Sequence, residues 1–454
     1  MRIDTSYFAG ERDGDGLTVV GTTVARADAL GHVTGRTQFF EDVNPAGMLH
    51  LKMHRSERHH ANIVSVDTSA AEAVKGVVKI LTHEDVPKNW YTVLTLINVG
   101  YPEELVLAEK KVLWYGEPIV AVVATSERAA REGAAAVKVV YEDLEPIFDV
   151  EEAIKPDAFP LKPHGTNYFE YEGHHCRRVR LGDVEKGFAE ADHIFEFKYQ
   201  SKPIEQAPTE TTGCIVEPKP DGRLKIYSNT QAAFFTLDNT ALILDVPFGK
   251  LQLVGGTVGG GFGGKVDVTV EPITCIAAMK TGKPVKYVYD RYEEMQVSSP
   301  RAAERIYIKD GVMSDGTIVA RQVTLYADAG AYSRHSPYAT TKAAAHMPGP
   351  YNIPNVHIDS WCVYTNRTPS SAMRGFGVTI ADFALESQMD RIARALEMDP
   401  LQLRLLNAYR DGDMKSHRKV AEGTALIEVI QKAAEMVGHE LPADFRALSS
   451  TEAR

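Results

Sequence analysis

The run GGTVGGGFGGKVDV, residues 255–268, constrains the fold more than any other stretch, because seven of its fourteen residues are glycine. Glycine loses the most conformational entropy on folding, so a run this rich in glycine belongs neither inside a helix nor inside a strand. The preceding residues KLQLV predict a strand, and Phe262 and Lys265 lie among the glycines. We therefore expect an ordered loop after a strand, whose bare N–H groups can approach an anion or a flat ligand.

Two nucleotide-binding patterns match this loop by letter. Residues 259–264 satisfy G-x-G-x-x-G, and residues 259–265 satisfy G-x-x-x-x-G-K. The phosphate-binding loop of nucleotide hydrolases needs Ser or Thr after its lysine to hold magnesium, and Val266 stands there. A dinucleotide loop belongs at the first strand of a βαβ series, whereas this loop lies more than 250 residues into the chain. The context therefore supports neither pattern.

A second Gly-Phe-Gly sequence, within SSAMRGFGVTIADFALESQMDRIA, also lies between a predicted strand and a predicted helix. The arginine before it, Arg374, can hold an anion. Phe262 and Phe376, each flanked by glycine, are expected to border pockets. Two backbone-rich loops with one guanidinium suit a large, polar, planar cofactor better than a nucleotide alone.

Composition excludes several classes of protein. The net charge of -11 argues against a nucleic-acid partner, and no apolar run is long enough to predict a membrane-spanning helix or a secretory signal. The four cysteines show no C-x-x-C spacing, so neither an iron–sulfur nor a zinc site is expected in this chain. Buried thiols in a reducing cytoplasm are the expectation. The histidines His54, His59 and His60 lack convergent partners, so no metal is expected there either.

A length of 454 residues predicts two or three domains. A buried strand at 119–124, an alanine-rich helix at 127–136 and a strand at 137–141 predict an α+β unit near the N-terminus. Further along, Phe383, Leu385, Met389, Ile392 and Leu396 predict the buried stripe of a long helix. The predicted organisation is an arm at 1–18, an α+β domain at 19–153, a proline-rich linker at 154–178, a second α+β domain at 179–422, and a helix with a polar tail at 423–454.

At this point the motifs resemble a known family. GGGFGGK and AMRGFG resemble the two signature loops of the molybdenum hydroxylases, the xanthine dehydrogenase and aldehyde oxidase family. HANIVSVDTSAAEAVKGV and VLWYGEPIVAVVA resemble its hammerhead domain, and PIEQAPTETTGCIVEP, YSNTQAAF and MDRIARALEMDPLQLRLLN resemble its cofactor region. The resemblance, over residues 19–438, implies an α+β fold. An N-terminal hammerhead α/β domain would be followed by the first molybdopterin-binding α+β domain of the family.

The resemblance also implies roles for individual residues. Gln231 matches the glutamine that approaches the apical ligand of molybdenum, and is the catalytic candidate. No side chain is expected to ligate the metal directly. The implied cofactor is molybdopterin with molybdenum, in the cytosine dinucleotide form. The residues that match the family's cofactor contacts are Gln231, Gly260, Gly261, Phe262, Gly263 and Arg374, and Phe376 matches the phenylalanine that packs on an aromatic substrate.

Two substitutions bear on the substrate. Val266 stands where purine-oxidising members carry a glutamate, and Lys342 stands where they carry an arginine. Lysine keeps the positive charge but loses the bidentate fork, so an anionic ring such as a pyridine carboxylate is expected to suit this site. The family's Pro-Gln after the second loop is Thr379-Ile380, which changes the pocket. Gly375 replaces the copper-binding cysteine of carbon monoxide dehydrogenases, so that activity is not expected.

The sequence contains no G-V-G-E loop, which in single-chain members carries the base glutamate within a second molybdopterin domain. We therefore expect a split enzyme, in which a medium molybdopterin subunit supplies the base. A small [2Fe–2S] subunit and an FAD subunit would accept the electrons. A shortened chain is the alternative.

Three functions are open at this point. The first is hydroxylation of a carbon of an N-heteroaromatic substrate, nicotinate-like or purine, with water as the oxygen source. The second is aldehyde oxidation. The third is a non-catalytic scaffold that retains the fold, against which the intact Gln231, Arg374 and both glycine loops argue.

Overall fold

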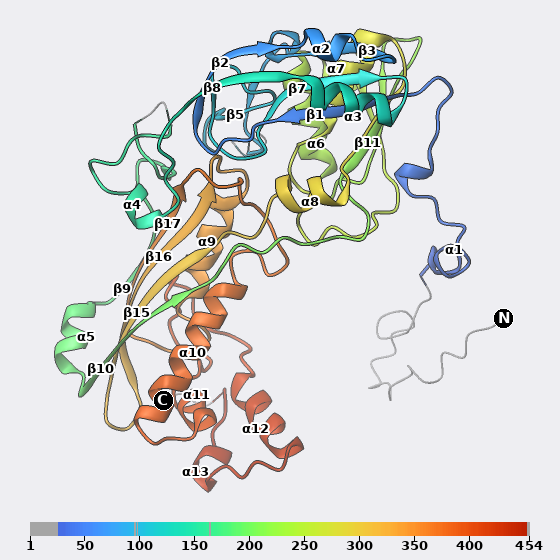
Figure 1. The fold of residues 1–454 in the computed structure, drawn as a ribbon. Coiled ribbons are helices and arrows are strands. Elements are labelled where there is room, and N and C mark those ends of the chain that lie inside the picture. Colours follow the sequence, from blue (N-terminus) through green and yellow to red (C-terminus); the bar gives the residue numbers. More distant parts are fainter. Residues whose placement is uncertain (1–25, 95–96, 98, 163–164, 452–454) are drawn as a thin grey trace.

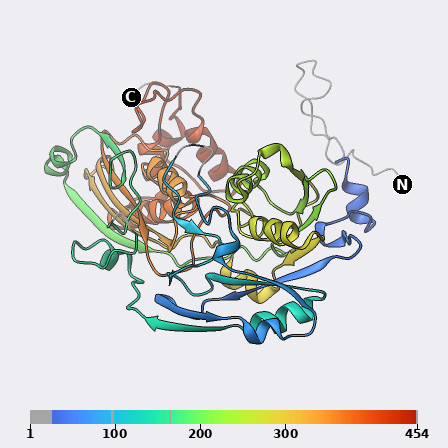
Figure 2. The same cartoon turned by 90° about the horizontal axis from the view of Figure 1, so that it is seen from above.

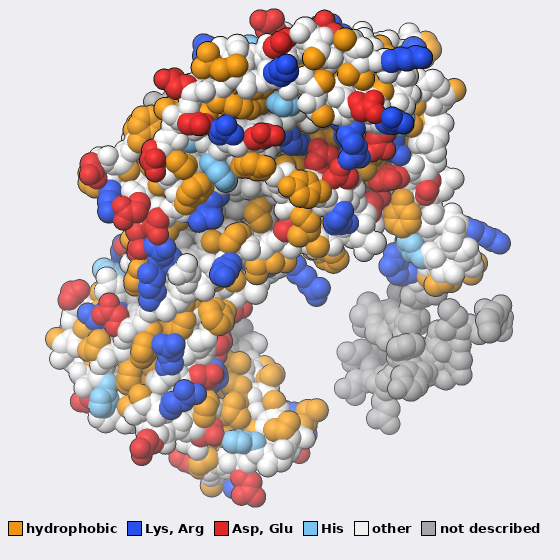
Figure 3. Space-filling model, in the orientation of Figure 1, with side chains coloured by type: hydrophobic (Ala, Val, Ile, Leu, Met, Phe, Trp, Pro, Cys, Tyr) orange, Lys and Arg blue, Asp and Glu red, His pale blue; other side chains and the backbone are white. Residues whose placement is uncertain are grey.

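The computed structural model describes residues 26–94, 97, 99–162 and 165–451. The predicted arm at 1–18 lies outside these residues. Figure 1 shows two lobes, an upper one built on a seven-stranded sheet and a lower one built on a five-stranded sheet. Figure 2 shows the same lobes from above, side by side. The surface is hollowed between the lobes in Figure 3, where hydrophobic side chains gather over the C-terminal helices.

The seven-stranded sheet joins the two predicted domains. Its strand β1 (Leu49–Arg55) pairs in parallel with β14 (Val285–Val288), so that residues 236 apart in the chain lie side by side. The sheet order is β13 (Leu251–Val254), β12 (Leu224–Ser228), β11 (Gly213–Pro218), β14, β1, β7 (Pro118–Ala124) and β3 (Val77–Leu81). The sheet therefore crosses the expected boundary near residue 153, and the domain limits stay predictions.

The N-terminal α+β unit agrees with the sequence prediction. Helix α3 (Glu127–Ala136) follows β7, and its N-cap Ser126 accepts a hydrogen bond from the Ala129 N–H. A separate small sheet contains β6 (Lys111–Val112), β2 (Ala61–Asp67) and β8 (Lys138–Asp143), and β4 (Trp90–Tyr91) pairs with β5 (Glu104–Leu105). Short helices α1 (Ala29–Val33), α2 (Ser69–Glu72) and α4 (Val150–Ala153) complete this region.

The five-stranded sheet carries helices on both faces. Its order is β10 (His193–Gln200), β15 (Glu304–Val312), β16 (Ile318–Gly330), β17 (Asn355–Tyr364) and β9 (Arg177–Leu181). Helices α9 (Ser336–His346) and α10 (Thr379–Ala395) pack against it, as does α5 (Val184–Glu190). The remaining helices are α6 (Ala233–Leu244), α7 (Glu271–Thr281), α8 (Arg291–Val297), α11 (Pro400–Asn407), α12 (Leu426–Met436) and α13 (Ala443–Arg446). No helix in the described ranges is long and apolar enough to cross a membrane.

One predicted core position of α10 is wrong. Leu385, Met389 and Ile392 are buried as expected, but Phe383 is 52% exposed. A residue two positions before Leu385 lies about 200° away from it around the helix, so the core face is taken instead by Ala381 and Ala384, both fully buried. The segment predicted as a linker is packed against the second region, because its Phe169 and Tyr171 contact Cys362 and Tyr364.

All four cysteines are buried and free, as the sequence predicts. Their burial in an apolar interior explains why none of them needs a disulfide partner.

A fully buried ion pair fixes the lower lobe. The Arg321 guanidinium donates to both Asp310 oxygens at 2.7 and 3.1 Å, from β16 to β15. Its remaining nitrogen faces the carbonyls of Met347 and Pro348 after α9, and Gln388 of α10 donates to Asp310 at 3.0 Å. One charge pair therefore ties both strands to two helices.

Removing one partner of this pair leaves an uncompensated buried charge. Asp310→Ala is expected to lower the free energy of unfolding by about 3–5 kcal/mol, measured by chemical denaturation followed by circular dichroism. The double variant Asp310→Leu/Arg321→Met removes both charges and is expected to lose less. A double variant that is less stable than Asp310→Ala would contradict the interpretation.

Candidate functional site

The glycine loop lies between β13 and α7. Gly260, Phe262 and Gly263 have φ values of 97°, 51° and 101°, in the left-handed region that glycine tolerates and phenylalanine rarely adopts. Phe262 is 47% exposed. The loop thus holds a strained backbone with one aromatic ring on its open side, which is the kind of strain found at ligand-binding sites.

Gln231 is held against this loop. It lies between β12 and α6, and its Oε1 accepts hydrogen bonds from the N–H groups of Gly263 at 3.0 Å and Lys265 at 3.3 Å. A Cβ at position 261 would lie 2.4 Å from the same oxygen. Gly261 is therefore required for the close approach of Gln231, and the side chain of Gln231 is fixed by backbone donors.

The second loop, residues 372–377, meets the first through backbone atoms. The Arg374 N–H donates to the Phe262 carbonyl at 2.8 Å. A Cβ at Gly263 would lie 2.7 Å from the Ala372 carbonyl oxygen. Behind the second loop, the buried Arg301 guanidinium donates to the carbonyls of Arg374 and Gly375. The structure thus brings both sequence motifs together as one surface.

Lys265 has a structural role that the sequence did not reveal. Its Nζ donates to the Glu210 carbonyl at 2.7 Å and lies 3.2 Å from the Glu210 carboxylate. The same carboxylate accepts from the Gly259 N–H at 2.7 Å. Burial lowers the pKa of Lys265, while the charge of Glu210 opposes this shift. The Glu210–Lys265 pair therefore fastens both ends of the glycine loop, and a sequence separation of 55 residues hides it from motif analysis.

Lys342 and Phe376 also lie together. The Lys342 Nζ is 5.2 Å from the centre of the Phe376 ring, within the range of a cation–π contact. Lys342 is exposed on α9, while Phe376 on the second loop and Val266 on the first are half-buried. An aromatic face and a cation therefore lie beside the two loops.

A buried carboxylate, Asp267, lies directly after the glycine loop. Its oxygens accept from Ser299, from Ser371 at 2.9 Å and from the ring of His335 at 2.8 Å. Burial opposes ionisation, but the hydrogen bond from His335 and the charge of Arg334 hold the pKa of Asp267 below its usual value. Sequence reasoning missed this residue, because its partners come from distant segments.

The surface formed by the two loops fits a large planar cofactor. Gly261 and Gly263 leave it without side chains, since a Cβ at either position would overlap a neighbour. Gln231 and Arg374 are exposed. Within the part of the chain that the structure describes, the Gln231 Nε2 and the Arg374 guanidinium donate to no protein atom. Both donors can therefore bind an anionic or carbonyl-rich ligand.

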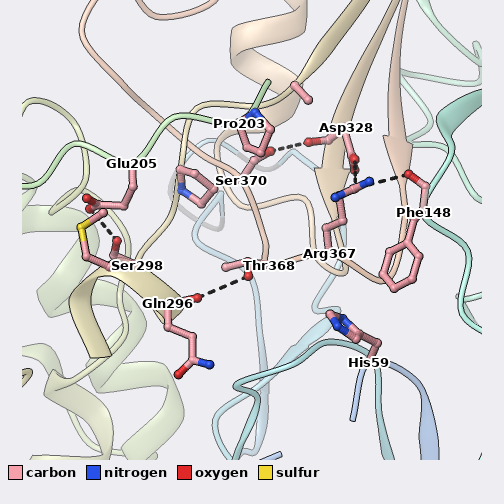
Figure 4. A pocket seen from close by; sticks show the side chains of 13 residues that line it. His59, Phe148, Pro203, Glu205, Gln296, Ser298, Asp328, Arg367, Thr368 and Ser370 are labelled. Atoms are coloured by element: carbon pink, nitrogen blue, oxygen red, sulfur yellow. Dashed lines mark hydrogen bonds and ion pairs between the residues drawn. The ribbon is translucent and has the colours of Figure 1, made fainter. Parts of the chain in front are cut away.

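A cavity of about 290 Å³ lies elsewhere, beside the segment that leads to the second loop (Figure 4). The Arg367 guanidinium pairs with Asp328 at 3.2 Å and donates to the Phe148 carbonyl at 3.3 Å. No residue predicted for the site lines this cavity. The candidate site is instead an open surface, where Gln231, Phe262 and Arg374 are exposed.

Two buried carboxyl groups lie near this cavity, at the end of the five-stranded sheet. Burial raises the pKa of Asp328 to about 6, although hydrogen bonds from Thr365 and the Gly330 N–H oppose this. Burial also raises the pKa of Glu304 to about 8, opposed by the charge of Arg301. Glu304 lines an adjoining cavity of about 560 Å³.

The histidine cluster is structural. The Nδ1 atoms of His54, His59 and His60 bond to the carbonyls of Ala134, Asn366 and Glu145. His54 thus links β1 to α3, and His59 links the first region to the segment that follows β17.

Comparison with known proteins agrees with this geometry. Residues 167–408 match the molybdopterin cofactor-binding domain, and residues 34–145 match the hammerhead domain of aldehyde oxidase and xanthine dehydrogenase. The nicotinate dehydrogenase large molybdopterin subunit of Eubacterium barkeri is 34% identical over 433 residues, which cover 94% of this chain and 99% of that one.

Solved structures show the same fold. The aldehyde oxidoreductase of Desulfovibrio desulfuricans superimposes with a TM-score of 0.87 at 30% identity, over 92% of this chain and 47% of that one. The quinoline 2-oxidoreductase of Pseudomonas putida 86 gives 0.83 at 25% identity, over 92% of this chain and 54% of that one. The chain thus spans about half the length of these two solved relatives.

The fold and the matches define a molybdopterin-binding subunit of an oxidoreductase. The chain belongs to the xanthine dehydrogenase family of molybdenum enzymes, and it is a homologue of the nicotinate dehydrogenase large molybdopterin subunit. The predicted fold class, a hammerhead domain followed by a molybdopterin-binding domain, is confirmed.

The contact between the loops can be tested at Gly263. Gly263→Ala would place a methyl group against the Ala372 carbonyl and impose a strained φ, at a cost of about 1–2 kcal/mol for the backbone alone. We expect the purified enzyme to lose most of its molybdenum, measured by elemental analysis. Gly256→Ala, where a Cβ meets nothing within 4 Å, is the matched control. Full molybdenum content in Gly263→Ala would refute the role of this contact.

The raised pKa of Glu304 predicts a pH-dependent stability. A carboxyl whose folded pKa lies above its unfolded value binds more protons when folded, so its contribution to stability falls as pH rises. For Glu304 the fall runs from about pH 4.5 to about pH 8. Glu304→Gln, which resembles the protonated acid, is expected to match the wild-type melting temperature at pH 5 and exceed it at pH 9. The exposed Glu196→Gln serves as the control, and a parallel pH profile for Glu304→Gln would contradict the assignment.

Proposed function

We propose that the chain is the large molybdopterin subunit of a split molybdenum hydroxylase that acts on an N-heteroaromatic carboxylate such as nicotinate. The observation that carries the proposal is the placement of Lys342 over Phe376, beside both cofactor loops. The near full-length match to a nicotinate dehydrogenase large subunit supports the same substrate class.

The proposed roles of the cofactor contacts follow from the donors on the open surface. Molybdopterin, expected in the cytosine dinucleotide form, supplies a molybdenum centre that oxidises a carbon with oxygen from water. The amide of Gln231 and the guanidinium of Arg374 donate to it. The backbone of Gly260, Gly261, Phe262 and Gly263 would contact it, because glycine leaves the N–H groups accessible.

Substrate recognition would combine one ring and one charge. The Phe376 ring packs against the heterocycle, and the Lys342 ammonium pairs with the carboxylate. Val266 offers an apolar contact where a glutamate would repel the same anion. A substrate with both a ring and a carboxylate therefore uses all three residues.

The catalytic base and the other half of the site are proposed to come from a medium molybdopterin subunit. The open position of Gln231, Phe262 and Arg374 is consistent with a partner that covers them. A small [2Fe–2S] subunit and an FAD subunit complete the proposed electron path. A cytoplasmic location, which the four free thiols favour, is part of the proposal.

Two other functions stay as outcomes of the experiment. Aldehyde oxidation is favoured by the likeness to aldehyde oxidoreductases. A non-catalytic scaffold would bind no molybdenum.

The test uses the complex purified with its natural partner chains. Its molybdenum content is measured, and steady-state oxidation of nicotinate, xanthine and benzaldehyde is compared. Lys342→Met is expected to raise KM for nicotinate about tenfold or more, equivalent to a loss of about 1.4 kcal/mol or more, and to change KM for a neutral pyridine less than twofold. Lys186→Met, on the exposed surface of α5, is the control.

Equal effects of Lys342→Met on charged and neutral substrates would overturn the carboxylate assignment. Activity with benzaldehyde alone would favour aldehyde oxidation. If the purified complex contains no molybdenum, the non-catalytic scaffold is the only one of the three functions that remains.

A further inference from the structure

His335 lies where three parts of the candidate site meet. It is the N-cap residue of α9. Its Nδ1 is 2.8 Å from Asp267, just after the glycine loop, and 3.4 Å from the Ser371 hydroxyl, just before the second loop. Its ring stands edge-on to Phe235, with the centres 5.4 Å apart. Phe235 lies one turn into α6, the helix that follows Gln231.

The orientation of this ring is set by Asp267. A carboxylate only accepts hydrogen bonds when ionised, so the Nδ1 atom of His335 carries a proton and donates it to Asp267. Asp267 is in turn held by the Ser299 and Ser371 hydroxyls and lies 4.0 Å from the Arg334 guanidinium. This arrangement turns the opposite nitrogen, Nε2, away from Asp267.

The Nε2 atom is free to meet a ligand. Within the described ranges it bonds to no protein atom, and the His335 side chain is 12% exposed. An imidazole fixed through one nitrogen, with the other open, is the usual arrangement of a histidine that binds or orients a ligand.

Helix α9 aligns His335 with the proposed carboxylate site. His335, Tyr338 and Lys342 follow at spacings of three and four residues, which places them on one face of the helix. Tyr338 is 42% exposed, and Lys342 covers the ring of Phe376. The seven residues from His335 to Lys342 correspond to about 10 Å along the helix axis. The second loop meets the helix between these two positions, where Gly377 packs against the Ala339 carbonyl.

We propose that His335 is a second substrate-contacting residue: as an imidazolium paired with the Asp267 carboxylate, it donates its Nε2–H to the ring nitrogen of a pyridine-type carboxylate while Lys342 binds the carboxylate. Asp267 is a positioning residue that acts through His335. This inference rests on the proposed function and deepens it. The ring nitrogen and the carboxylate are recognised by different residues, so the two contributions can be separated.

The experiment uses the purified complex and two probes that differ at the ring nitrogen. Nicotinate is the substrate, and benzoate, which has the carboxylate but lacks the nitrogen, is a competitive inhibitor. His335→Asn keeps an amide donor near the Nδ1 position toward Asp267 and removes Nε2. We expect it to raise KM for nicotinate about tenfold and to leave the inhibition constant of benzoate within twofold. Lys342→Met is expected to weaken both ligands.

A rescue variant distinguishes a direct contact of His335 with the substrate from a purely structural role. His335→Gln extends its amide toward the Nε2 position and is expected to recover part of the affinity for nicotinate. Asp267→Asn, which leaves the ring without its anionic partner, is expected to raise KM for nicotinate by a larger factor than it raises the inhibition constant of benzoate. Molybdenum content and melting temperature are measured for every variant.

Three results would overturn the role of His335. One is an equal loss of nicotinate and benzoate affinity in His335→Asn, and another is no loss of either. The third is loss of molybdenum in both His335→Asn and His335→Gln, which would make the residue structural. The proposed function fails separately, if the molybdenum-loaded wild type neither oxidises nicotinate nor depends on Lys342.

Discussion

The buried, ionised carboxylate of Asp267 is the constraint around which the candidate site is built. A charge removed from water is tolerated only when donors surround it, because its desolvation costs several kcal/mol. The donors here come from Ser299, His335 and Ser371, which lie on three different segments. Satisfying one carboxylate therefore positions the end of the glycine loop, the start of α9 and the approach to the second loop at once.

The same network links the site to the first region of the chain. Arg334, next to His335, pairs with the buried Glu104 of β5 at 2.7 Å, and burial raises the pKa of Glu104. The neighbouring Ser333 N–H donates to Glu103 at 2.6 Å. Together with the pairing of β1 and β14, these contacts make the hammerhead region a support for the loops rather than a separate unit. A change in that region can therefore alter the site without touching it.

The glycines of the two loops keep the surface of the candidate site free of side chains. Gln231 reaches the loop only because Gly261 has no Cβ, and the two loops touch only because Gly263 has none. The exposed side chains on the two loops are Phe262 and Arg374, and Lys342 of α9 covers the Phe376 ring of the second loop. The surface is open on the side where a cofactor and a partner chain are proposed to bind. The cavities of about 290 and 560 Å³ lie away from this surface.

The sequence by itself determined the family, the fold class and the two loops, because these depend on local patterns. Glycine runs exclude regular structure, and the order of the motifs matches one family. The apolar stripe of α10 was predicted except at Phe383, where the helical period and not the residue type decides burial. Only the tertiary structure decided the partners of Lys265 and His335, which lie 55 and 68 residues away from Glu210 and Asp267. Those pairings arise when loops that are far apart in the chain are packed together by the fold, and no local pattern of residues encodes a contact that chain topology creates.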